Sequence, residues 1–210
     1  MRRLPGLIRN GRVWRMRMNA LLLRATLQHV GSRAMIDPTV WFEYPEKISL
    51  ADECEIRRGA ILNGRSSEET GIVLGKGVHI HQYACLDAYG GFIHLGEGVR
   101  IGRHSVLSGH GGITFGAYSG VAGLSYVIAS NHQFRDTATP HVLQESVNLG
   151  INIGENVWGG CGVVIADGVN IGDNCVIGAG SVVRQDVPSH SVVLGNPARV
   201  AYTFEASGPE

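Results

Sequence analysis

Aliphatic residues recur at every sixth position over most of the chain, in six sets of three. Of these 18 positions, 17 hold Leu, Ile, Val or Phe, and only Gly159 departs from the pattern. The residue four places further on is small or Val in every case but Asn131. The repeating positions, here called anchors, are Leu50, Ile56 and Leu62; Leu74, Ile80 and Leu86; Leu95, Ile101 and Leu107; Phe115, Val121 and Val127; Ile153, Gly159 and Ile165; and Ile171, Ile177 and Val183.

A period of six matches neither the 3.6-residue period of a helix nor the two-residue alternation of a lone strand. It matches a short strand and a turn that repeat around a three-sided prism, with the anchors pointing to its axis and small residues in its crowded corners. Three anchors close one coil. The pattern therefore predicts an all-β fold, a parallel β-helix of about six coils with an N-terminal helical segment and one long inserted loop.

The interruptions of the repeat predict where its loops leave the prism. Successive coils begin 24, 21, 20, 38 and 18 residues apart, and every surplus over 18 lies between the third anchor of one coil and the first anchor of the next. We therefore expect all insertions along one edge. The longest is the loop 131–152, which contains His132, Phe134 and His141. Long loops in compact folds are functional or disordered, so we expect a site here.

Residues 1–30 lack the repeat, and residues 1–36 carry eight Arg and no acid, a charge of +8 that the rest of the chain balances with −8. Interleaved Leu, Met and Trp predict an amphipathic helix from about residue 10 to residue 30, bounded by Gly11 and Gly31. Two roles stay open, peripheral contact of residues 1–30 with an anionic membrane and a cap over the open end of the β-helix. We divide the chain into a basic helical leader (1–36), a β-helix domain (37–203) and a tail (204–210).

The composition argues against several classes of protein. The chain is 44% hydrophobic and 17% charged, too apolar for disorder, and it has no apolar run long enough to span a membrane. Equal numbers of basic and acidic residues argue against a nucleic-acid partner. We find no pattern typical of a secretory signal, and the four Cys lack the close spacing of a zinc or dithiol site. We therefore expect a cytoplasmic protein, peripheral at the inner face of the membrane if the leader binds anionic lipid.

Three features together resemble the hexapeptide-repeat acyltransferases: the hexads, the loop that begins at His132, and the segments 153–160, 177–182 and 195–200, the last reading Gly-Asn-Pro-Ala-Arg-Val. The similarity covers about residues 48–203 and is greatest to the galactoside, maltose and surface-polysaccharide O-acetyltransferases. The resemblance implies a left-handed β-helix, a homotrimer with active sites between neighbouring prisms, and acetyl-CoA as the acyl donor. It also implies a sugar or glycan acceptor.

The resemblance makes His132 the catalytic base, since a sugar hydroxyl is a poor nucleophile and imidazole accepts a proton near neutral pH. His110 lies near this base in the repeat and is expected either to touch the acceptor or to be one of a stack of polar side chains. Asn131 either positions the imidazole or caps the turn of the loop. We interpret Asp87 as a solvated turn residue.

The resemblance also implies the contacts of acetyl-CoA along the last coils. Backbone N–H groups at Cys161 and Ala179 would contact the thioester and pantetheine arm, with Gly160 leaving room for the ligand. Trp158 would flank the cofactor or pack between subunits, and Gly159 would loosen the core where relatives have Ile. Cations near the nucleotide phosphates would be Arg184 and Arg199, since guanidinium groups bind phosphate in a bidentate manner.

The resemblance thus implies an acetyl-CoA-dependent O-acetyltransferase that acts on a sugar hydroxyl, and we expect direct transfer. Two alternatives stay open: an N-acetyltransferase for a nucleotide-linked amino sugar, and a β-helical scaffold without activity. A further interpretation, a zinc carbonic anhydrase, draws on four histidines whose spacing does not match that family, and we predict no metal site. These histidines are His79, His81, His94 and His104.

Overall fold

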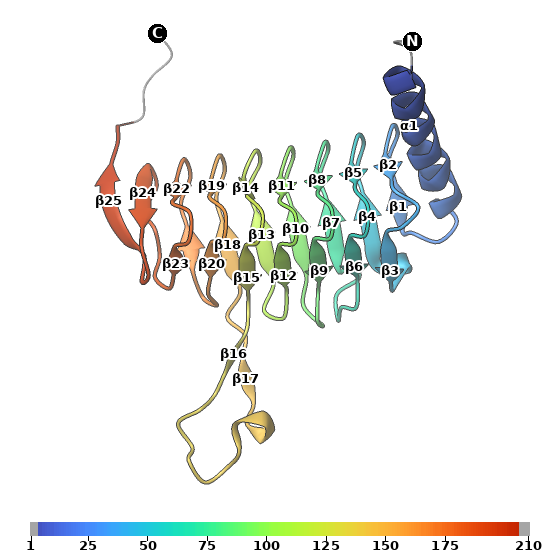
Figure 1. The fold of residues 1–210 in the computed structure, drawn as a ribbon. Helices are drawn as coiled ribbons and strands as arrows, with labels where there is room; N and C mark the ends of the chain where they lie inside the picture. The colour runs from blue at the N-terminus through green and yellow to red at the C-terminus, as the bar shows by residue number, and fades with distance from the viewer. Residues whose placement is uncertain (1–3, 206–210) are drawn as a thin grey trace.

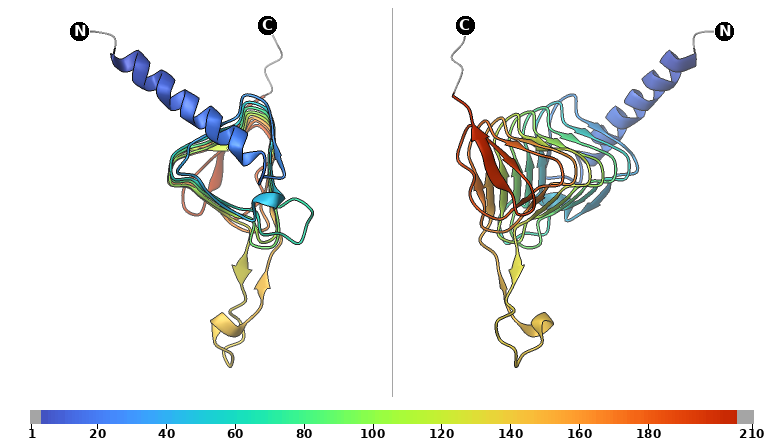
Figure 2. Two further views of the ribbon diagram at one scale, coloured as in Figure 1. Left: turned by 90° about the vertical axis from the view of Figure 1, so that its right-hand side faces the viewer. Right: turned by 60° about the vertical axis from the view of Figure 1, so that its left-hand side comes forward.

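A computed structural model describes the backbone of residues 4–205 and the side chains of residues 11–205. The chain forms one helix followed by a three-sided parallel β-helix (Figures 1 and 2). Figure 2 shows the triangular outline end-on, with one long hairpin projecting from a corner. The predicted all-β fold and the helical N-terminal segment are confirmed.

Each side of the prism is a sheet whose neighbouring strands are about one coil apart in sequence. Sheet 1 contains β1 (His29–Val30), β4 (Ile48–Leu50), β7 (Ile72–Leu74), β10 (Ile93–Leu95), β13 (Ile113–Phe115), β18 (Ile151–Ile153) and β21 (Asn170–Ile171). Sheet 2 contains β2 (Met35–Ile36), β5 (Glu55–Ile56), β8 (His79–Ile80), β11 (Arg100–Ile101), β14 (Gly120–Val121), β19 (Trp158–Gly159), β22 (Val176–Ile177), β24 (Ser191–Leu194) and β25 (Arg199–Thr203). Sheet 3 contains β3 (Trp41–Glu43), β6 (Ile61–Asn63), β9 (Cys85–Asp87), β12 (Val106–Ser108), β15 (Tyr126–Ile128), β20 (Val164–Ile165) and β23 (Val182–Val183).

The anchors pair in register from coil to coil and form the buried core, as predicted. Ile80, for example, pairs with Ile56 on one side and Ile101 on the other, and all three are fully buried. At Gly159 the space for a side chain is already taken, because a Cβ there would lie 2.9 Å from Cγ1 of Val121. The expected loosening of the core at Gly159 is therefore wrong.

The β-helix extends beyond the expected six coils at both ends. Seven coils have strands in all three sheets, and β24 continues an eighth. The extra first coil uses Val30, Ile36 and Phe42, which also lie six residues apart, so the β-helix begins inside the segment assigned to the leader. A longer connection to Leu50, with the 3₁₀ helix η1 (Pro45–Lys47), hides this coil from the periodic pattern.

Helix α1 (Leu4–Leu23) starts and ends earlier than the sequence predicts, and Gly11 lies inside it. Its second half covers the open end of the first coil, burying Met16 and Ala20, while its first half projects beyond the prism (Figure 2). Asn19 donates a 3.2 Å hydrogen bond to the carbonyl of Ile36, a group at the exposed strand edge. The helix is therefore a cap, because it covers and partly pairs an edge that would otherwise be open.

Two further findings bear on the expectations. No helix among residues 4–205 is long and apolar enough to cross a membrane. Residues 206–210, most of the predicted tail, lie outside the described residues, as do residues 1–3 of the leader.

Candidate functional site

The long insertion is a hairpin that leaves the edge between sheets 3 and 1 (Figure 1). Strands β16 (Asn131–His132) and β17 (Ser146–Val147) pair in antiparallel register, and the 3₁₀ helix η2 (His141–Leu143) lies beyond them. His132 sits at the base of the hairpin, where its Nδ1 lies 3.5 Å from the hydroxyl of Ser146. Both His132 and Asn131 are exposed. The predicted base therefore stands on the surface next to the prism edge.

His110 lies at the same edge, one coil before the hairpin. Its Nδ1 lies 3.3 Å from the hydroxyl of Ser108, and its ring stacks on Tyr89 with the centroids 4.3 Å apart. Partial burial lowers the pKa of His110, Asp87 acts in the opposite direction, and a positive charge on His132 lowers it further. The structure thus places His110 at the prism edge from which the hairpin with His132 leaves.

A polar row that the sequence interpretation missed runs along this edge of sheet 3. Glu43, Asn63, Asp87 and Ser108 lie side by side in consecutive coils. The side-chain amide of Asn63 donates to Glu43 at 2.9 Å and to Asp87 at 3.3 Å, and the backbone N–H of Tyr89 donates to Asp87 at 3.0 Å.

Asp87 is a turn residue as expected, since it accepts from the N–H of Tyr89 two residues on, but its side chain is half-buried rather than solvated. Partial burial raises the pKa of its carboxyl, while the bonds from Tyr89 and Asn63 partly counteract this. The signal in the sequence was the polar residue that directly follows the third anchor in three consecutive coils, at Asn63, Asp87 and Ser108.

Next to the polar row, the outer face of sheet 3 carries an apolar row with one side chain per coil. The pairing register places these residues in one line: Trp41, Ile61, Cys85, Val106, Tyr126, Val164 and Val182. The outward positions of sheet 1 are mostly polar by contrast, among them Ser49, His94 and Thr114. A continuous apolar line on one face of a prism is typical of a surface that contacts another protein.

The residues expected to hold the acyl donor gather at a different edge, between sheets 2 and 3. Cys161 and Ala179 occupy equivalent corner positions in successive coils, and both are exposed. The next residues, Gly162 and Gly180, have positive φ and nothing within 4 Å of a Cβ position. Earlier coils have bulky side chains at this place, Tyr83, His104 and Leu124.

Only toward the C-terminal end of the prism does this corner lack bulky side chains, at Gly162 and Gly180. We call this part the bare corner. Among the described residues, the N–H groups of Cys161 and Ala179 donate no backbone hydrogen bond. A thin ligand can approach this corner because Gly162 and Gly180 carry no side chain and the space at their Cβ positions is open.

Gly160 is explained by the stacking of coils rather than by room for a ligand. A Cβ at Gly160 would lie 2.6 Å from the backbone nitrogen of Ala179 in the next coil. Trp158 lies on the outer face of sheet 2, between Gly120 and Val176, and lines a hollow of about 350 Å³ with Tyr118. Its exposed indole is therefore separate from His132.

The two predicted phosphate contacts lie apart. Arg184 follows Val183 in sheet 3 and is exposed at the edge with the polar row, across that sheet from Ala179. Arg199 begins β25, pairs with Leu194 in sheet 2, and donates to the carbonyl of Ala198 at 2.8 Å. The N–H of Ala198 in turn donates to the carbonyl of Val182, which keeps Arg199 near the bare corner.

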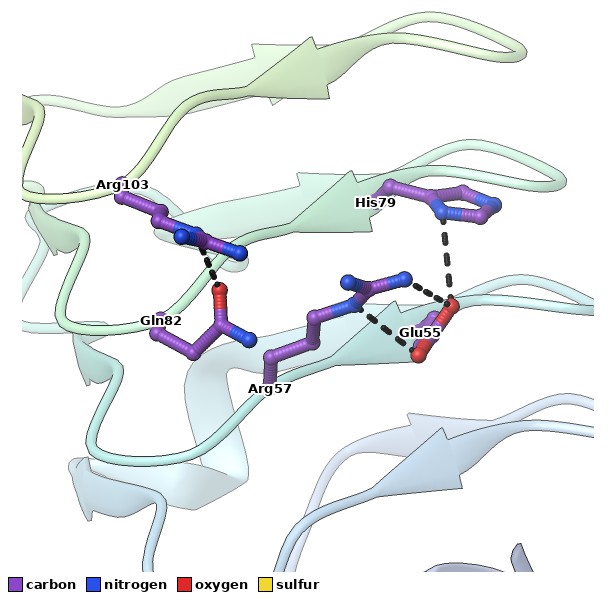
Figure 3. Close-up of polar contacts among 5 residues, drawn as sticks. All are labelled: Glu55, Arg57, His79, Gln82 and Arg103. Carbon is purple, nitrogen blue, oxygen red and sulfur yellow. Dashed lines mark hydrogen bonds and ion pairs between the residues drawn. The ribbon is translucent and has the colours of Figure 1, made fainter. Parts of the chain in front are cut away.

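The histidines of sheet 2 and its neighbours have local partners. His79 lies 3.4 Å from Glu55, which also binds Arg57, as Figure 3 shows. His94 packs against Phe92, and His104 stacks on Tyr83. No group of three potential metal ligands occurs among the residues whose placement the structure describes.

The geometry thus separates two groups. His132, Asn131 and His110 share the edge between sheets 3 and 1, whereas Cys161 and Ala179 share the edge between sheets 2 and 3. The full width of sheet 3, with its apolar row, lies between them. One prism alone therefore does not bring the predicted base next to the predicted donor groups.

Comparisons with known proteins agree with this fold. Residues 150–185 match the family model for bacterial transferase hexapeptide repeats. The structure resembles a point mutant of AntD, an N-acyltransferase from Bacillus cereus, in complex with dTDP and coenzyme A, at 18% identity over 89% of each chain and a TM-score of 0.65.

Two further structures are similar to the chain. A second point mutant of AntD from Bacillus cereus, in complex with dTDP-4-amino-4,6-dideoxyglucose and coenzyme A, has 19% identity over 89% of each chain and a TM-score of 0.64. The hexapeptide-repeat acetyltransferase VCA0836 from Vibrio cholerae, in complex with acetyl-CoA, has 22% identity, covers 93% of this chain and 86% of its own, and gives a TM-score of 0.46.

Proposed function

We propose that this hexapeptide-repeat β-helix protein is an acetyl-CoA-dependent acyltransferase that acetylates a hydroxyl group of a sugar or glycan precursor. The observation that carries the proposal is the position of His132, an exposed imidazole at the base of the long hairpin, beside His110 and the polar row. The polar row offers hydrogen-bond partners for the hydroxyl groups of a sugar. The chain's match to transferase hexapeptide repeats and its fold support the same reaction class.

In the proposed reaction His132 accepts the proton of the attacking hydroxyl while that oxygen bonds to the thioester carbonyl carbon. The resulting oxyanion is stabilised by backbone N–H donors, for which the N–H groups of Cys161 and Ala179 are our candidates. When the C–S bond breaks, protonated His132 returns the proton to the leaving thiolate. A base of this kind typically accelerates the reaction about 10²- to 10⁴-fold. Arg199 and Arg184 are our candidates for contact with the phosphates of acetyl-CoA.

The proposed site is shared between two copies of the chain, in a trimer. The separation of the two edges by sheet 3 supports this, because a neighbouring prism on the apolar row would bring its own bare corner toward His132. The exposed apolar side chains of the hairpin also support a shared site, since Phe134, Val142 and Leu143 are each about seven-tenths exposed. A short two-stranded hairpin with apolar side chains in water gains stability by packing on a neighbour.

Transfer to an amine is the second candidate. The observation in its favour is the resemblance to AntD, an N-acyltransferase in complex with a nucleotide-linked amino sugar. A neutral amine attacks a thioester without a strong base, so an N-acyltransferase depends much less on His132. The two candidates therefore differ in how strongly the rate depends on that side chain.

The exposed face of α1 supports a further proposal, peripheral contact with an anionic membrane. Trp14 and Leu22 are exposed among Arg12, Arg15 and Arg17, and each Arg near such a surface contributes about 1 kcal/mol. The capping role of the buried face, which carries Met16 and Ala20, is compatible with this contact.

The decisive experiment replaces His132 by Ala and uses His141→Ala as the matched control, since His141 is exposed on the same hairpin. Release of free thiol from acetyl-CoA is followed with a panel of sugars, nucleotide sugars and amino sugars. We expect His132→Ala to lose about 10²-fold or more with hydroxyl acceptors, and the control to keep the wild-type rate. A wild-type rate for His132→Ala refutes the base, and product with amino sugars alone favours the second candidate.

A further inference from the structure

A basic groove separates helix α1 from the corner between sheets 2 and 3 in the first coils. Its volume is about 1130 Å³, comparable with pockets that hold small ligands. One wall is the helix, with Arg12 and Arg15; the other is the corner, with Arg58 and Arg103. Neither the proposed base nor the proposed donor groups line it.

The four guanidinium groups of this groove have no acidic partner in the described part of the chain. Arg12 and Arg15 are three residues apart on a helix and so share one of its faces. Arg12, Arg15 and Arg58 form no ion pair with any residue that the structure describes. Arg103 donates to the amide oxygen of Gln82, a neutral group, at 2.9 Å (Figure 3).

One carboxylate, Asp37, also lines the groove. Asp37 is about nine-tenths buried and accepts hydrogen bonds from the backbone N–H and the hydroxyl of Thr39, at 3.1 and 2.7 Å. Four cations on two facing walls repel one another unless an anion lies between them. With the Asp37 carboxylate counted, the four Arg still leave a net charge of +3 around the groove, and this excess is the chemical signature of an anion site.

Aromatic side chains add flat surfaces to the same groove. Tyr83 and His104 stack in successive coils, with ring centroids 5.1 Å apart and an interplanar angle of 14°. Trp14 lies on the helix wall and is 63% exposed. From Thr39 to His104 the groove spans four coils, about 14 Å at the spacing of β-strands. A ligand of that length can place phosphate between the arginines and a planar or apolar part on the rings.

We propose that this groove binds a phosphate-bearing ligand, with guanidinium groups of the helix and of the prism corner on opposite sides of its phosphates. Arginine is suited to this because its planar fork binds phosphate in a bidentate manner. The same chemistry fits a soluble nucleoside diphosphate and the headgroup of an anionic lipid. Because α1 forms one wall, binding would also fasten the helix to the prism.

The test measures binding and does not depend on acyl transfer. Calorimetry of the full chain uses inorganic pyrophosphate and UDP, and flotation uses phosphatidylcholine vesicles with and without phosphatidylglycerol. The variants are Arg15→Gln, Arg103→Gln and the matched control Arg17→Gln, which removes the same charge from the same helix but does not line the groove. All three positions are exposed, so the fold should be retained.

We expect at least one probe to bind, and Arg15→Gln and Arg103→Gln each to weaken it about tenfold, with Arg17→Gln unchanged for pyrophosphate and UDP. For vesicles, where Arg17 adds to the surface contact proposed above, we expect Arg17→Gln to weaken binding by about fivefold at most. Tighter binding of UDP than of pyrophosphate identifies a nucleotide, and binding to phosphatidylglycerol vesicles alone identifies a lipid headgroup. The proposal is overturned if no probe binds. It is equally overturned if Arg17→Gln weakens the binding of pyrophosphate or UDP as much as Arg15→Gln does, because diffuse surface charge would then explain the effect.

Discussion

The stacking of coils makes a quantitative prediction at Gly102. A Cβ at this position would lie 2.3 Å from both the carbonyl carbon of Ala122 and the nitrogen of Gly123 in the next coil. Ordinary contact begins near 3.4 Å, so the two coils would have to separate locally by about 1 Å. The hydrogen bond from the N–H of Gly102 to the carbonyl of Val121, now 2.8 Å, would then be lost. Overpacking and the lost bond together should destabilise Gly102→Ala by about 2–4 kcal/mol.

Gly77→Ala is the matched control. Gly77 has φ +67°, but nothing lies within 4 Å of its Cβ position. Gly77→Ala introduces backbone strain but no steric clash. Because the unfolded chain has lower entropy with Ala than with Gly, part of this cost is offset, and we expect a loss of about 1 kcal/mol in the free energy of unfolding. Urea unfolding followed by circular dichroism, at one fixed protein concentration, compares the two. If Gly102→Ala loses no more stability than Gly77→Ala, the reasoning from coil stacking is refuted.

Two further predictions concern protons and thiols. Burial is the main cause of the lowered pKa of four histidines, which are His79, His81, His94 and His110. In the unfolded chain these histidines return to a pKa near 6.5, so below that pH the unfolded chain binds more protons than the folded chain. The free energy of unfolding should therefore fall as the pH drops below about 6.5. Urea midpoints should show a shallower fall in His94→Gln, and an identical pH profile would contradict this. Burial also raises the pKa of the Cys54 thiol to about 11, so a thiol reagent should label the exposed Cys161 first. The fast phase of labelling should be absent from Cys161→Ser, and an unchanged fast phase would contradict this prediction.

The core of the fold was predictable because anchor positions need only apolar character and a fixed spacing. Ile80 and Ile101 illustrate this, since the six-residue period alone places them on one axis. The first coil was missed because its anchors lie among the arginines of the leader and a longer connection separates Phe42 from Leu50. The start of α1 was also misjudged, because Gly11 in a helix is costly but not prohibitive when the second half of that helix is packed on the prism.

The candidate site was less predictable than the core. The position of His132 at the hairpin base follows from the interrupted period, but the burial and hydrogen bonds of Asp87 depend on contacts between coils. The basic groove combines Arg15 with Arg103, which are distant in sequence and meet only because the helix folds back on the prism. The spacing of residues in the sequence does not predict that these two arginines line one groove.

The central claim is that His132 of one copy acts on an acyl donor held at the bare corner of its neighbour. Complementation tests it directly: His132→Ala and Ala179→Trp, each inactive alone, are unfolded, mixed in equal amounts and refolded together. If each site combines the base of one copy with the corner of the next, random trimers regain about one quarter of the wild-type sites. Thiol release from acetyl-CoA at about that level is the predicted result, and a mixture as inactive as its two components would contradict the shared site.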